Sequence, residues 1–196
     1  MGFSLKYISP YIIAGGNSFR MGRDKRLLIY SGMTLLDRVC LLAETVTGKR
    51  PVLVGDNLPL IYRSRYQTIP DALPNKGPLA GLVAALEHNT CPWSLILPVD
   101  MPGLREEVIE GLFSVLGENV EAAALSGNNF IEPLAAVYRT NCASFWRNRL
   151  ELGELSLIKG MYLLKHRACD VNNYREVLIN LNRPADFTPL LRRSVV

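Results

Sequence analysis

The stretch YIIAGGNSFRMGRDK, residues 11–25, decides the fold class of this chain. Its apolar start, 11–14, is typical of a short buried strand, and the irregular polar segment behind it fits no helical or strand period. Glycines let backbone N–H groups approach a phosphate closely, and Arg20 and Lys25 add positive charge. The order of strand, glycines and cations predicts a phosphate-binding loop. A glycine-rich connection with solvent-facing basic residues is the alternative.

Outward from this loop, apolar runs alternate with amphipathic segments. Pro10 predicts that strand pairing starts after it, or that the strand begins irregularly. Strands are expected at 51–54, near Ile69, and at 93–99, 122–125, 134–138 and 177–181. Helices are expected behind a capping box at 34–37 and ending at Gly48, then at 79–88, 106–116, 143–150, 155–164 and from Pro184.

The alternation of strands and helices predicts βαβ units with right-handed crossovers. We therefore expect one three-layer α/β/α domain over residues 1–196, built on a mostly parallel, Rossmann-like sheet. Ligands of such sheets bind beyond the carboxyl ends of the strands, so the loops that follow strands are the places to search.

Composition limits the function classes. The chain has 196 residues, 48% of them hydrophobic, and a net charge of +4. Its dispersed basic residues favour an anionic ligand over nucleic acid, because no basic stripe is interleaved with aromatic residues. Four scattered cysteines and two histidines argue against a zinc site or a disulfide framework. No segment suits a secretory signal or a bilayer span, which predicts a cytoplasmic protein with no membrane contact.

A second candidate site combines Asp71 with the segment GPLAG, residues 77–81. Small residues at a helix entry permit close backbone contact with a flat base. The Asp71 carboxylate can accept hydrogen bonds from the N1–H and exocyclic amine of guanine, a donor pair that adenine lacks. The alternative is an ordinary turn in which Asp71 caps the helix or is solvated.

A third candidate is Asp100, within LILPVDMP at residues 95–102. A carboxylate at the carboxyl end of a buried strand can face the ligand crevice, and Mg²⁺ is commonly held by one or two carboxylates together with phosphates and waters. Asp100 is therefore a candidate metal ligand. The alternative is that it only caps the next helix.

A fourth candidate is NLNRPAD, residues 180–186. Asn180 and Asn182 alternate, so an extended backbone puts both amides on one side, where they suit a heteroaromatic ligand with several donors and acceptors. Pro184 fits the first position of a helix, and Asn182 as a plain helix cap is the alternative.

The glycine-rich loop resembles the GGxSxRMGxDK signature of the MobA family, the molybdenum cofactor guanylyltransferases. The matching residues are Gly15, Gly16, Ser18, Arg20, Met21, Gly22, Asp24 and Lys25. The resemblance spans about 11–187. It implies that Ala14 and Gly15 line the guanine and ribose, and that Arg20 and Lys25 contact the triphosphate of GTP. It also implies that Asp71 and GPLAG bind guanine, that Asp100 holds Mg²⁺, and that Asn180 and Asn182 bind molybdopterin.

By this resemblance the chain transfers GMP from GTP to the phosphate of molybdenum-molybdopterin and releases pyrophosphate. Arg20, Lys25 and Asp100 are the expected catalytic residues. The expected nucleotide-binding residues are Ile13, Ala14, Gly15, Gly16, Ser18, Arg20, Gly22, Lys25, Gly55, Asp71, Gly77, Pro78, Leu79, Gly81 and Asp100. The nucleotide part is expected at about 1–102 and the acceptor part at about 103–196. Proteins that make the metal-loaded pterin or receive the finished cofactor are the implied partners.

One segment departs from the family pattern. Members often carry arginine before serine in a GxRSL stretch near the acceptor, whereas this chain has GELSL at 153–157, with Leu155 in place of the cation. Lys159 lies one helical turn later and can supply the charge, so the expected acceptor-binding residues are Ser156, Lys159, Asn180 and Asn182. Alternative functions are a cytidylyl- or sugar-phosphate nucleotidyltransferase, or a non-catalytic GTP-binding protein that escorts the cofactor.

Overall fold

The computed structural model describes residues 4–15, 24–128, 130–174 and 176–181, and it is organised around a seven-stranded sheet. The strands are β1 (Ile8–Ile13), β4 (Val52–Val54), β5 (Thr68–Ile69), β6 (Trp93–Pro98), β7 (Ala122–Gly127), β8 (Phe130–Arg139) and β9 (His166–Asp170). Their order is β5-β4-β1-β6-β8-β7-β9. Within this sheet β8 pairs antiparallel with both of its neighbours, and the other pairs are parallel. The predicted mostly parallel sheet is confirmed.

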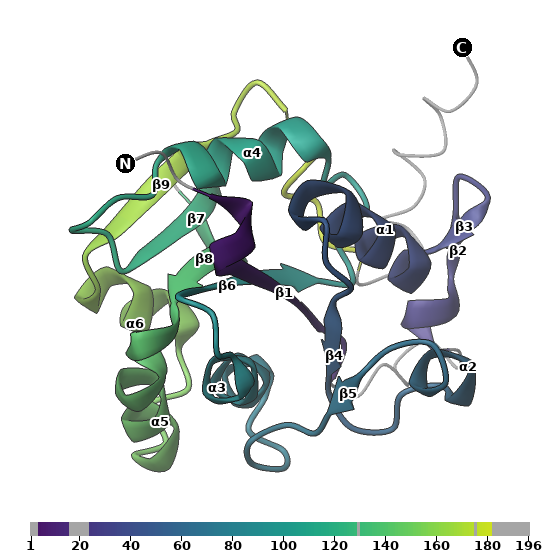
Figure 1. Ribbon diagram of the computed structural model, residues 1–196, viewed down its shortest axis with the longest axis horizontal. Helices are drawn as coiled ribbons and strands as arrows, with labels where there is room; N and C mark the ends of the chain where they lie inside the picture. The colour runs from purple at the N-terminus through teal and green to yellow at the C-terminus, as the bar shows by residue number, and fades with distance from the viewer. Residues whose placement is uncertain (1–3, 16–23, 129, 175, 182–196) are drawn as a thin grey trace.

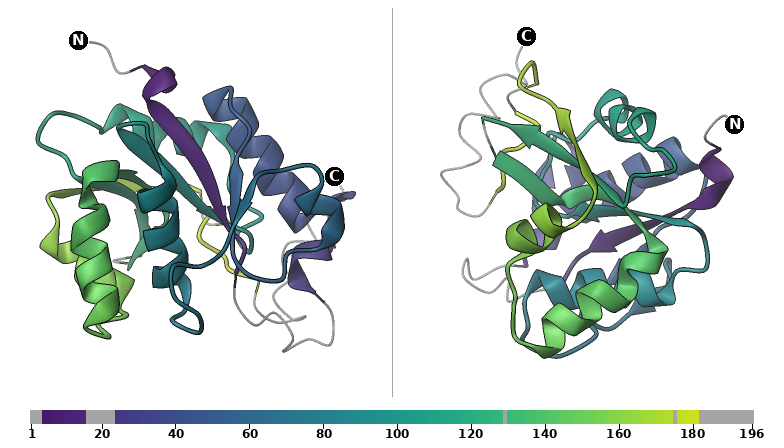
Figure 2. Two further views of the ribbon diagram at one scale, coloured as in Figure 1. Left: turned by 60° about the horizontal axis from the view of Figure 1, so that its bottom comes forward. Right: turned by 90° about the vertical axis from the view of Figure 1, so that its left-hand side faces the viewer.

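Helices cover both faces of the sheet (Figures 1 and 2). The α-helices are α1 (Leu35–Thr47), α2 (Leu60–Arg63), α3 (Pro78–His88), α4 (Glu106–Ser114), α5 (Ala143–Glu151) and α6 (Leu157–Leu163). Short 3₁₀ turns are η1 (Leu5–Tyr7), η3 (Lys25–Leu27) and η4 (Thr140–Cys142), and β2 (Ile29–Tyr30) pairs with β3 (Met33–Thr34) in a small hairpin. The three-layer α/β/α arrangement is as the sequence predicts.

Alternating side chains of the strands form two hydrophobic cores. Ile12 on β1 packs with the buried faces of α1 and α4, whereas its neighbours Tyr11 and Ile13 pack with α3, α5 and α6. This alternation follows from the two-residue period of a strand. Figure 1 shows α1 and α4 on one side of the sheet and α3 and α5 on the other.

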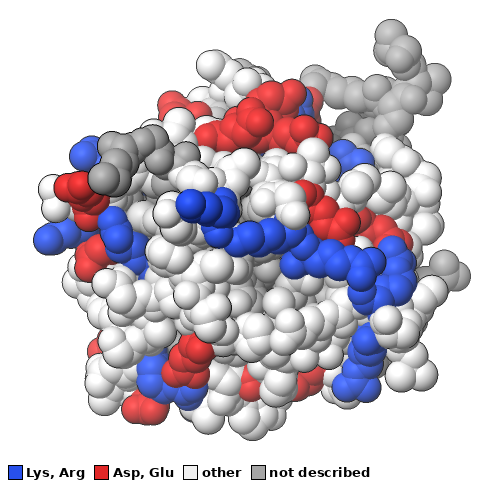
Figure 3. Space-filling model, viewed as in Figure 1, with Lys and Arg blue, Asp and Glu red and all other residues white. Residues whose placement is uncertain are grey.

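The limits of α1 follow local sequence signals. Thr34 Oγ1 accepts the backbone N–H of Asp37 at 3.0 Å, and Gly48 ends the helix in the left-handed region with φ 67°. Both signals are the expected ones for helix ends. Acidic side chains gather over α4 in Figure 3, where the exposed Glu106 and Glu107 occupy its first turn, the position that the helix dipole favours.

The prediction that pairing begins after Pro10 is wrong. β1 begins at Ile8, and Pro10 pairs in register with Leu95 of β6. The Ala14 N–H bonds the Val54 carbonyl of β4. Because successive backbone nitrogens alternate sides, the nitrogen of Pro10 also faces β4. That strand begins only at Val52, so no ladder donor is missing at Pro10.

The end of the described chain also differs from expectation. Residues 177–181 form no strand, and the edge strand next to β7 is β9, which the sequence analysis did not predict. All five residues of β9 are exposed or half-buried, so the strand carries no strong apolar period. The expected helix from Pro184 lies outside the described residues.

No helix among the described residues is both long and apolar enough to cross a membrane. All four cysteines are free thiols, and Cys40 and Cys142 are buried.

Candidate functional site

Three loops meet at one edge of the sheet. β1 lies between β4 and β6, all three are parallel, and their carboxyl ends lead into Gly15, Gly55 and Asp100 respectively. Carboxyl ends of parallel strands share an edge, which brings together loops that are distant in the sequence. The edge contains the beginning of the glycine-rich loop.

Gly15 and Gly55 touch backbone to backbone. A Cβ added at Gly55 would lie 2.5 Å from the Gly15 Cα, and Gly55 has φ +139°. Both the clash and the left-handed backbone favour glycine at this position. The segments after β1 and β4 therefore approach closely where the glycine-rich loop begins, which gives a structural reason for glycine at position 55.

Lys25 and Asp100 form an ion pair at this edge. Lys25 Nζ lies 2.8 Å from Asp100 Oδ2, and the two side chains are 26% and 18% exposed. They border a cavity of about 210 Å³. Its lining residues are Ile13, Ala14, Gly15, Lys25, Arg26, Pro78, Pro98, Val99, Asp100 and Leu134. The structure thus joins the glycine-rich loop, the start of GPLAG and the strand-end aspartate in one cavity.

Arg26 is a cavity residue that the sequence analysis did not select. Its guanidinium is buried and donates to the Asp24 carboxylate, to the Ala14 carbonyl at 3.1 Å and to the Asn57 carbonyl at 2.9 Å. It ties the end of β1 to η3 and to the loop after β4. Its position directly after Lys25 was the only signal, and a basic run does not distinguish an exposed cation from a buried one.

Asp71 lies against two glycines. A Cβ added at Gly15 would lie 2.9 Å from Asp71 Oδ2, and one at Gly81 would lie 3.2 Å from Asp71 Oδ1. Burial, and secondarily the negative charge of Asp56, raise the pKa of Asp71 to about 6. The helix-cap alternative for Asp71 is wrong, because α3 has Gly77 as its N-cap and no side-chain cap.

Other predicted nucleotide-binding residues are either buried in the core or lie outside the described residues. Leu79 is fully buried in the core under α3, so its side chain packs there and does not line the cavity. Gly16, Ser18, Arg20 and Gly22 lie outside the described residues.

Asp100 does not cap the next helix, since α4 begins six residues later, after Arg105.

The predicted acceptor residues separate in space. The Leu181 N–H bonds the Asp100 carbonyl at 2.8 Å, and the Asn180 side chain lies close enough to the buried Glu132 carboxylate to stabilise its charged form. Asn180 therefore lies beside the cavity, whereas Asn182 is outside the described residues. Ser156 caps α6 by accepting the Lys159 N–H at 3.3 Å.

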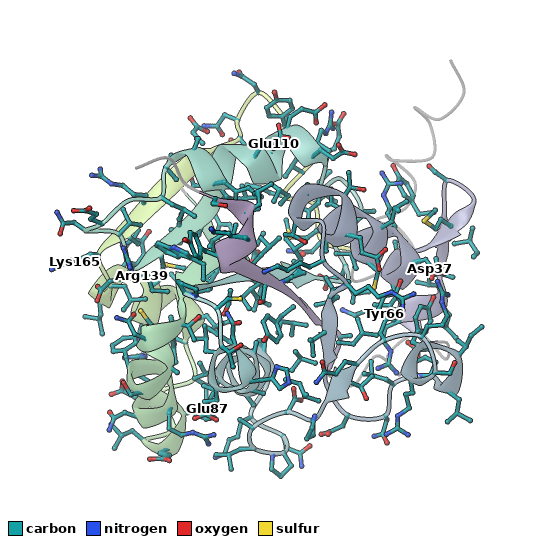
Figure 4. All side chains as sticks on the ribbon, viewed as in Figure 1. Asp37, Tyr66, Glu87, Glu110, Arg139 and Lys165 are labelled. Atoms are coloured by element: carbon teal, nitrogen blue, oxygen red, sulfur yellow. The ribbon has the colours of Figure 1, made fainter. Side chains whose placement is uncertain are left out.

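Ser156 and Lys159 line a different hollow, of about 600 Å³. Its other lining residues are Arg149, Gly153, Glu154, Leu155 and Leu163. Arg149 supplies a cation there, but Glu154 already pairs with it at 2.6 Å. Behind the hollow, α5 is held against α3 by an ion pair between Arg147 and Glu87, the latter labelled in Figure 4. This hollow shares no lining residue with the cavity at Asp100.

Many known proteins are similar to this chain in sequence. A probable molybdenum cofactor guanylyltransferase from Opitutus terrae is 33% identical over 196 residues, covering 95% of this chain and 96% of that protein. A molybdenum cofactor guanylyltransferase from Serratia proteamaculans is 26% identical and covers 91% of each chain.

Solved structures match the fold. The molybdopterin-guanine dinucleotide biosynthesis protein A from Archaeoglobus fulgidus superposes with a TM-score of 0.74 at 24% identity, over 92% of this chain and 95% of that one. A nucleotidyl transferase from Methanothermobacter gives a TM-score of 0.73 at 14% identity, over 93% and 95%. The family model described as the MobA-like NTP transferase domain matches residues 11–167, and the chain belongs to that family.

Proposed function

We propose that this chain transfers GMP from GTP to the phosphate of molybdenum-molybdopterin and releases pyrophosphate. The observation that carries the proposal is the Lys25–Asp100 ion pair, 2.8 Å long, in the cavity where the glycine-rich loop begins. It supplies a cation for a triphosphate and a carboxylate for a metal ion in one place. The names of the curated relatives supply the nucleotide and the acceptor.

In this proposal the base is recognised at Asp71. Its carboxylate is half-buried between the glycines at 15 and 81 and accepts two N–H donors of guanine. Discrimination follows because adenine would leave the buried carboxylate unpaired, which costs more than losing a solvated contact. Ile13, Ala14 and Pro78 of the cavity lining then contact the nucleoside.

The residues fit Mg²⁺. Asp100 already faces a cation, the Lys25 ammonium, and remains partly exposed, so it can bind a metal without moving through the core. The described residues contain no group of three or more His, Cys, Asp and Glu that could hold a metal by themselves. One carboxylate is nevertheless sufficient when phosphates and waters complete the octahedron. A bound Mg²⁺ would neutralise charge that develops on the α-phosphate and the leaving pyrophosphate.

The chemistry requires no covalent intermediate. An acceptor phosphate oxygen forms the new bond to the α-phosphorus, and the bond from that phosphorus to the oxygen bridging to the β-phosphate breaks. A phosphate monoester has a second pKa of about 6 and is largely ionised near neutrality, so no protein base is needed. Lys25, with Arg20 from outside the described residues, stabilises the charge, and the walls of the cavity align the reactants.

The decisive experiment measures pyrophosphate release from Mg-GTP with molybdenum-loaded molybdopterin. Turnover is expected with GTP and not with CTP, ATP or UTP, and it should fall by at least about 100-fold in Lys25→Ala and Asp100→Ala. Preference for CTP would support a cytidylyltransferase instead, and turnover with a sugar phosphate alone would support a sugar-phosphate nucleotidyltransferase. GTP binding without pyrophosphate release in the presence of acceptor would support an escort protein.

A further inference from the structure

β8 contains a wide irregularity beside the proposed site. β7 pairs Ala124 with Ala136 of β8 but pairs the next residue, Leu125, with Glu132. Residues 133–135 of β8 therefore have no partner on β7, because Ala124 and Leu125 are consecutive. A β-bulge bends its strand and redirects side chains, and bulges are common next to active sites. Here the bulge brings Leu134 into the lining of the 210 Å³ cavity.

The bulge also ends the pairing between β8 and β6. That ladder stops at Ile96 and Ala136, although β6 continues to Pro98. The segment 176–181 lies beside the end of β6, where the Leu181 N–H bonds the Asp100 carbonyl at 2.8 Å. A Cβ at Gly103 would meet the Glu176 carbonyl carbon at 2.8 Å, so this segment also lies close against the loop after Asp100.

Glu132 connects the bulge to this segment. Its side chain is only 9% exposed, and Oε1 accepts the backbone N–H of Leu134 at 3.1 Å. The Asn180 side chain lies close enough to the Glu132 carboxylate to stabilise its charged form. Burial raises the pKa of Glu132, the interactions with Leu134 and Asn180 oppose the rise, and the negative charge of Asp100 adds to it.

The cost of burying the Glu132 carboxylate indicates a role beyond shaping the bulge in β8. A buried charge costs free energy unless hydrogen bonds compensate it, and one of the two donors that compensate here is a predicted acceptor-binding residue. The nearby charge of Asp100 makes the position still less favourable for an anion. An uncharged residue would satisfy the bulge at lower cost but would provide fewer acceptor lone pairs for the two donors.

We propose that Glu132 is a positioning residue of the site, whose carboxylate orients the Asn180 amide toward the phosphorylated pterin acceptor beside Asp100. This inference rests on the proposed function. Glu132 acts through Asn180 and touches neither substrate. Loss of Glu132 should therefore weaken binding of the acceptor and leave binding of GTP unchanged.

The test is a double-mutant cycle on the full chain with Glu132→Ala, Asn180→Ala and both together. Each single variant should raise the acceptor KM about 10-fold or more, the loss expected for a hydrogen bond to a charged group, with the GTP KM unchanged within about twofold. The acceptor KM of the double variant should be no higher than that of the more impaired single variant, because the two residues act as one unit. Independent, multiplying effects, or an unchanged acceptor KM, would overturn the proposal.

Glu121→Ala is the matched control, because Glu121 Oε2 likewise accepts a backbone N–H, that of Lys165, at 2.8 Å. It should leave the acceptor KM unchanged. If Glu132→Ala does not fold, Glu132→Gln takes its place. Glutamine keeps one acceptor oxygen but loses the negative charge and the second oxygen, so a smaller rise in the acceptor KM is expected, and no rise would count against the proposal.

Amide hydrogen exchange of the acceptor-free protein separates this inference from the proposed function. The Leu181 amide should exchange at least about 10-fold faster in Glu132→Ala than in wild type, and at the wild-type rate in Glu121→Ala. Unchanged exchange would overturn the inference whether or not the chain turns over. A wild-type chain that releases no pyrophosphate would overturn only the proposed function, and the exchange result would still decide whether Glu132 holds this segment.

Discussion

Lys25 Nζ and Asp100 Oδ2 lie 2.8 Å apart although 75 positions separate them in the sequence. Both side chains line the same cavity, where each charge is balanced by the other. The pair gives the site a cation and an anion that a metal–triphosphate complex can engage separately. Removing either residue therefore changes the net charge of the site and leaves the other residue without its ion-pair partner.

The first prediction concerns this pair. Lys25→Ala should lower kcat/KM for GTP by about 100-fold or more, because a charge aimed at the reacting phosphates is lost. Asp100→Asn should instead raise the Mg²⁺ concentration needed for half-maximal rate. The measurement is pyrophosphate release over a magnesium titration. The matched control is the ion pair of Arg65 and Asp37, 3.0 Å apart and outside the cavity lining, whose alanine variants should stay within about twofold of the wild-type rate.

The second prediction concerns Asp71→Asn. The folded-state pKa of about 6 exceeds the ordinary 3.8, so between these values the native state binds the proton more tightly than the unfolded chain does. Wild-type stability therefore falls as pH rises through this window. Allowing for solvent contact, the asparagine variant should gain about 1 kcal/mol at pH 8, roughly 2–4 °C in Tm, and little at pH 4.

The same variant should bind GTP about 10- to 100-fold more weakly at pH 8, since one acceptor becomes a donor facing guanine N–H groups. Calorimetric Tm at the two pH values and GTP titration at pH 8 measure the two effects. A variant that is less stable at pH 8 would contradict the raised pKa. Unchanged GTP affinity would remove Asp71 from the base site.

The third prediction compares two glycines with positive φ. In Gly55→Ala the new Cβ meets the Gly15 backbone, so the loop after β1 must shift. In Gly32→Ala the φ is +81° but no atom lies within 4 Å, and only the backbone strain remains, about 1 kcal/mol. GTP affinity should fall strongly in the first variant and not in the second. Equal affinities would show that the close contact does not matter for the nucleotide.

The fourth prediction tests how α6 is held. A Cβ at Gly160 would lie 2.5 Å from Trp146 Cη2, in a ring that is fully buried. Gly160→Ala should lower the free energy of unfolding by about 1–3 kcal/mol through overpacking, despite the better helix propensity of alanine. Gly117→Ala, where no atom lies within 4 Å, should change it by under about 0.5 kcal/mol. Denaturant titration measures both.

The sequence was sufficient for the parallel half of the fold. Apolar runs next to glycine, proline or aspartate located β1, β4 and β6 and the loops that follow them, because burial on both faces leaves a continuous apolar signal. Pro10 misled the prediction because its position relative to a neighbouring strand, which decides whether a missing N–H matters, is not visible in one sequence.

The acceptor side was less predictable. Residues 177–181 have strand-like composition, but they do not join the sheet, and Leu181 bonds Asp100 in the loop after β6. Glu132 and Arg26 were not selected, because their roles depend on partners 48 and 31 positions away in the sequence. Ser156 and Lys159 were chosen with Asn180, yet only Asn180 lies by Asp100, because motif spacing carries no information on which face of the sheet a helix covers.

The bond from Leu181 to the Asp100 carbonyl has a consequence for how the protein is made. Ribosomes deliver the chain from the amino terminus, so Lys25, Asp71 and Asp100 emerge long before residues 176–181. A nascent chain halted at residue 175 would carry every described nucleotide-side group but neither Asn180 nor the Leu181 amide. The proposed site is therefore assembled in a fixed order in time, with the half proposed to bind the acceptor completed last.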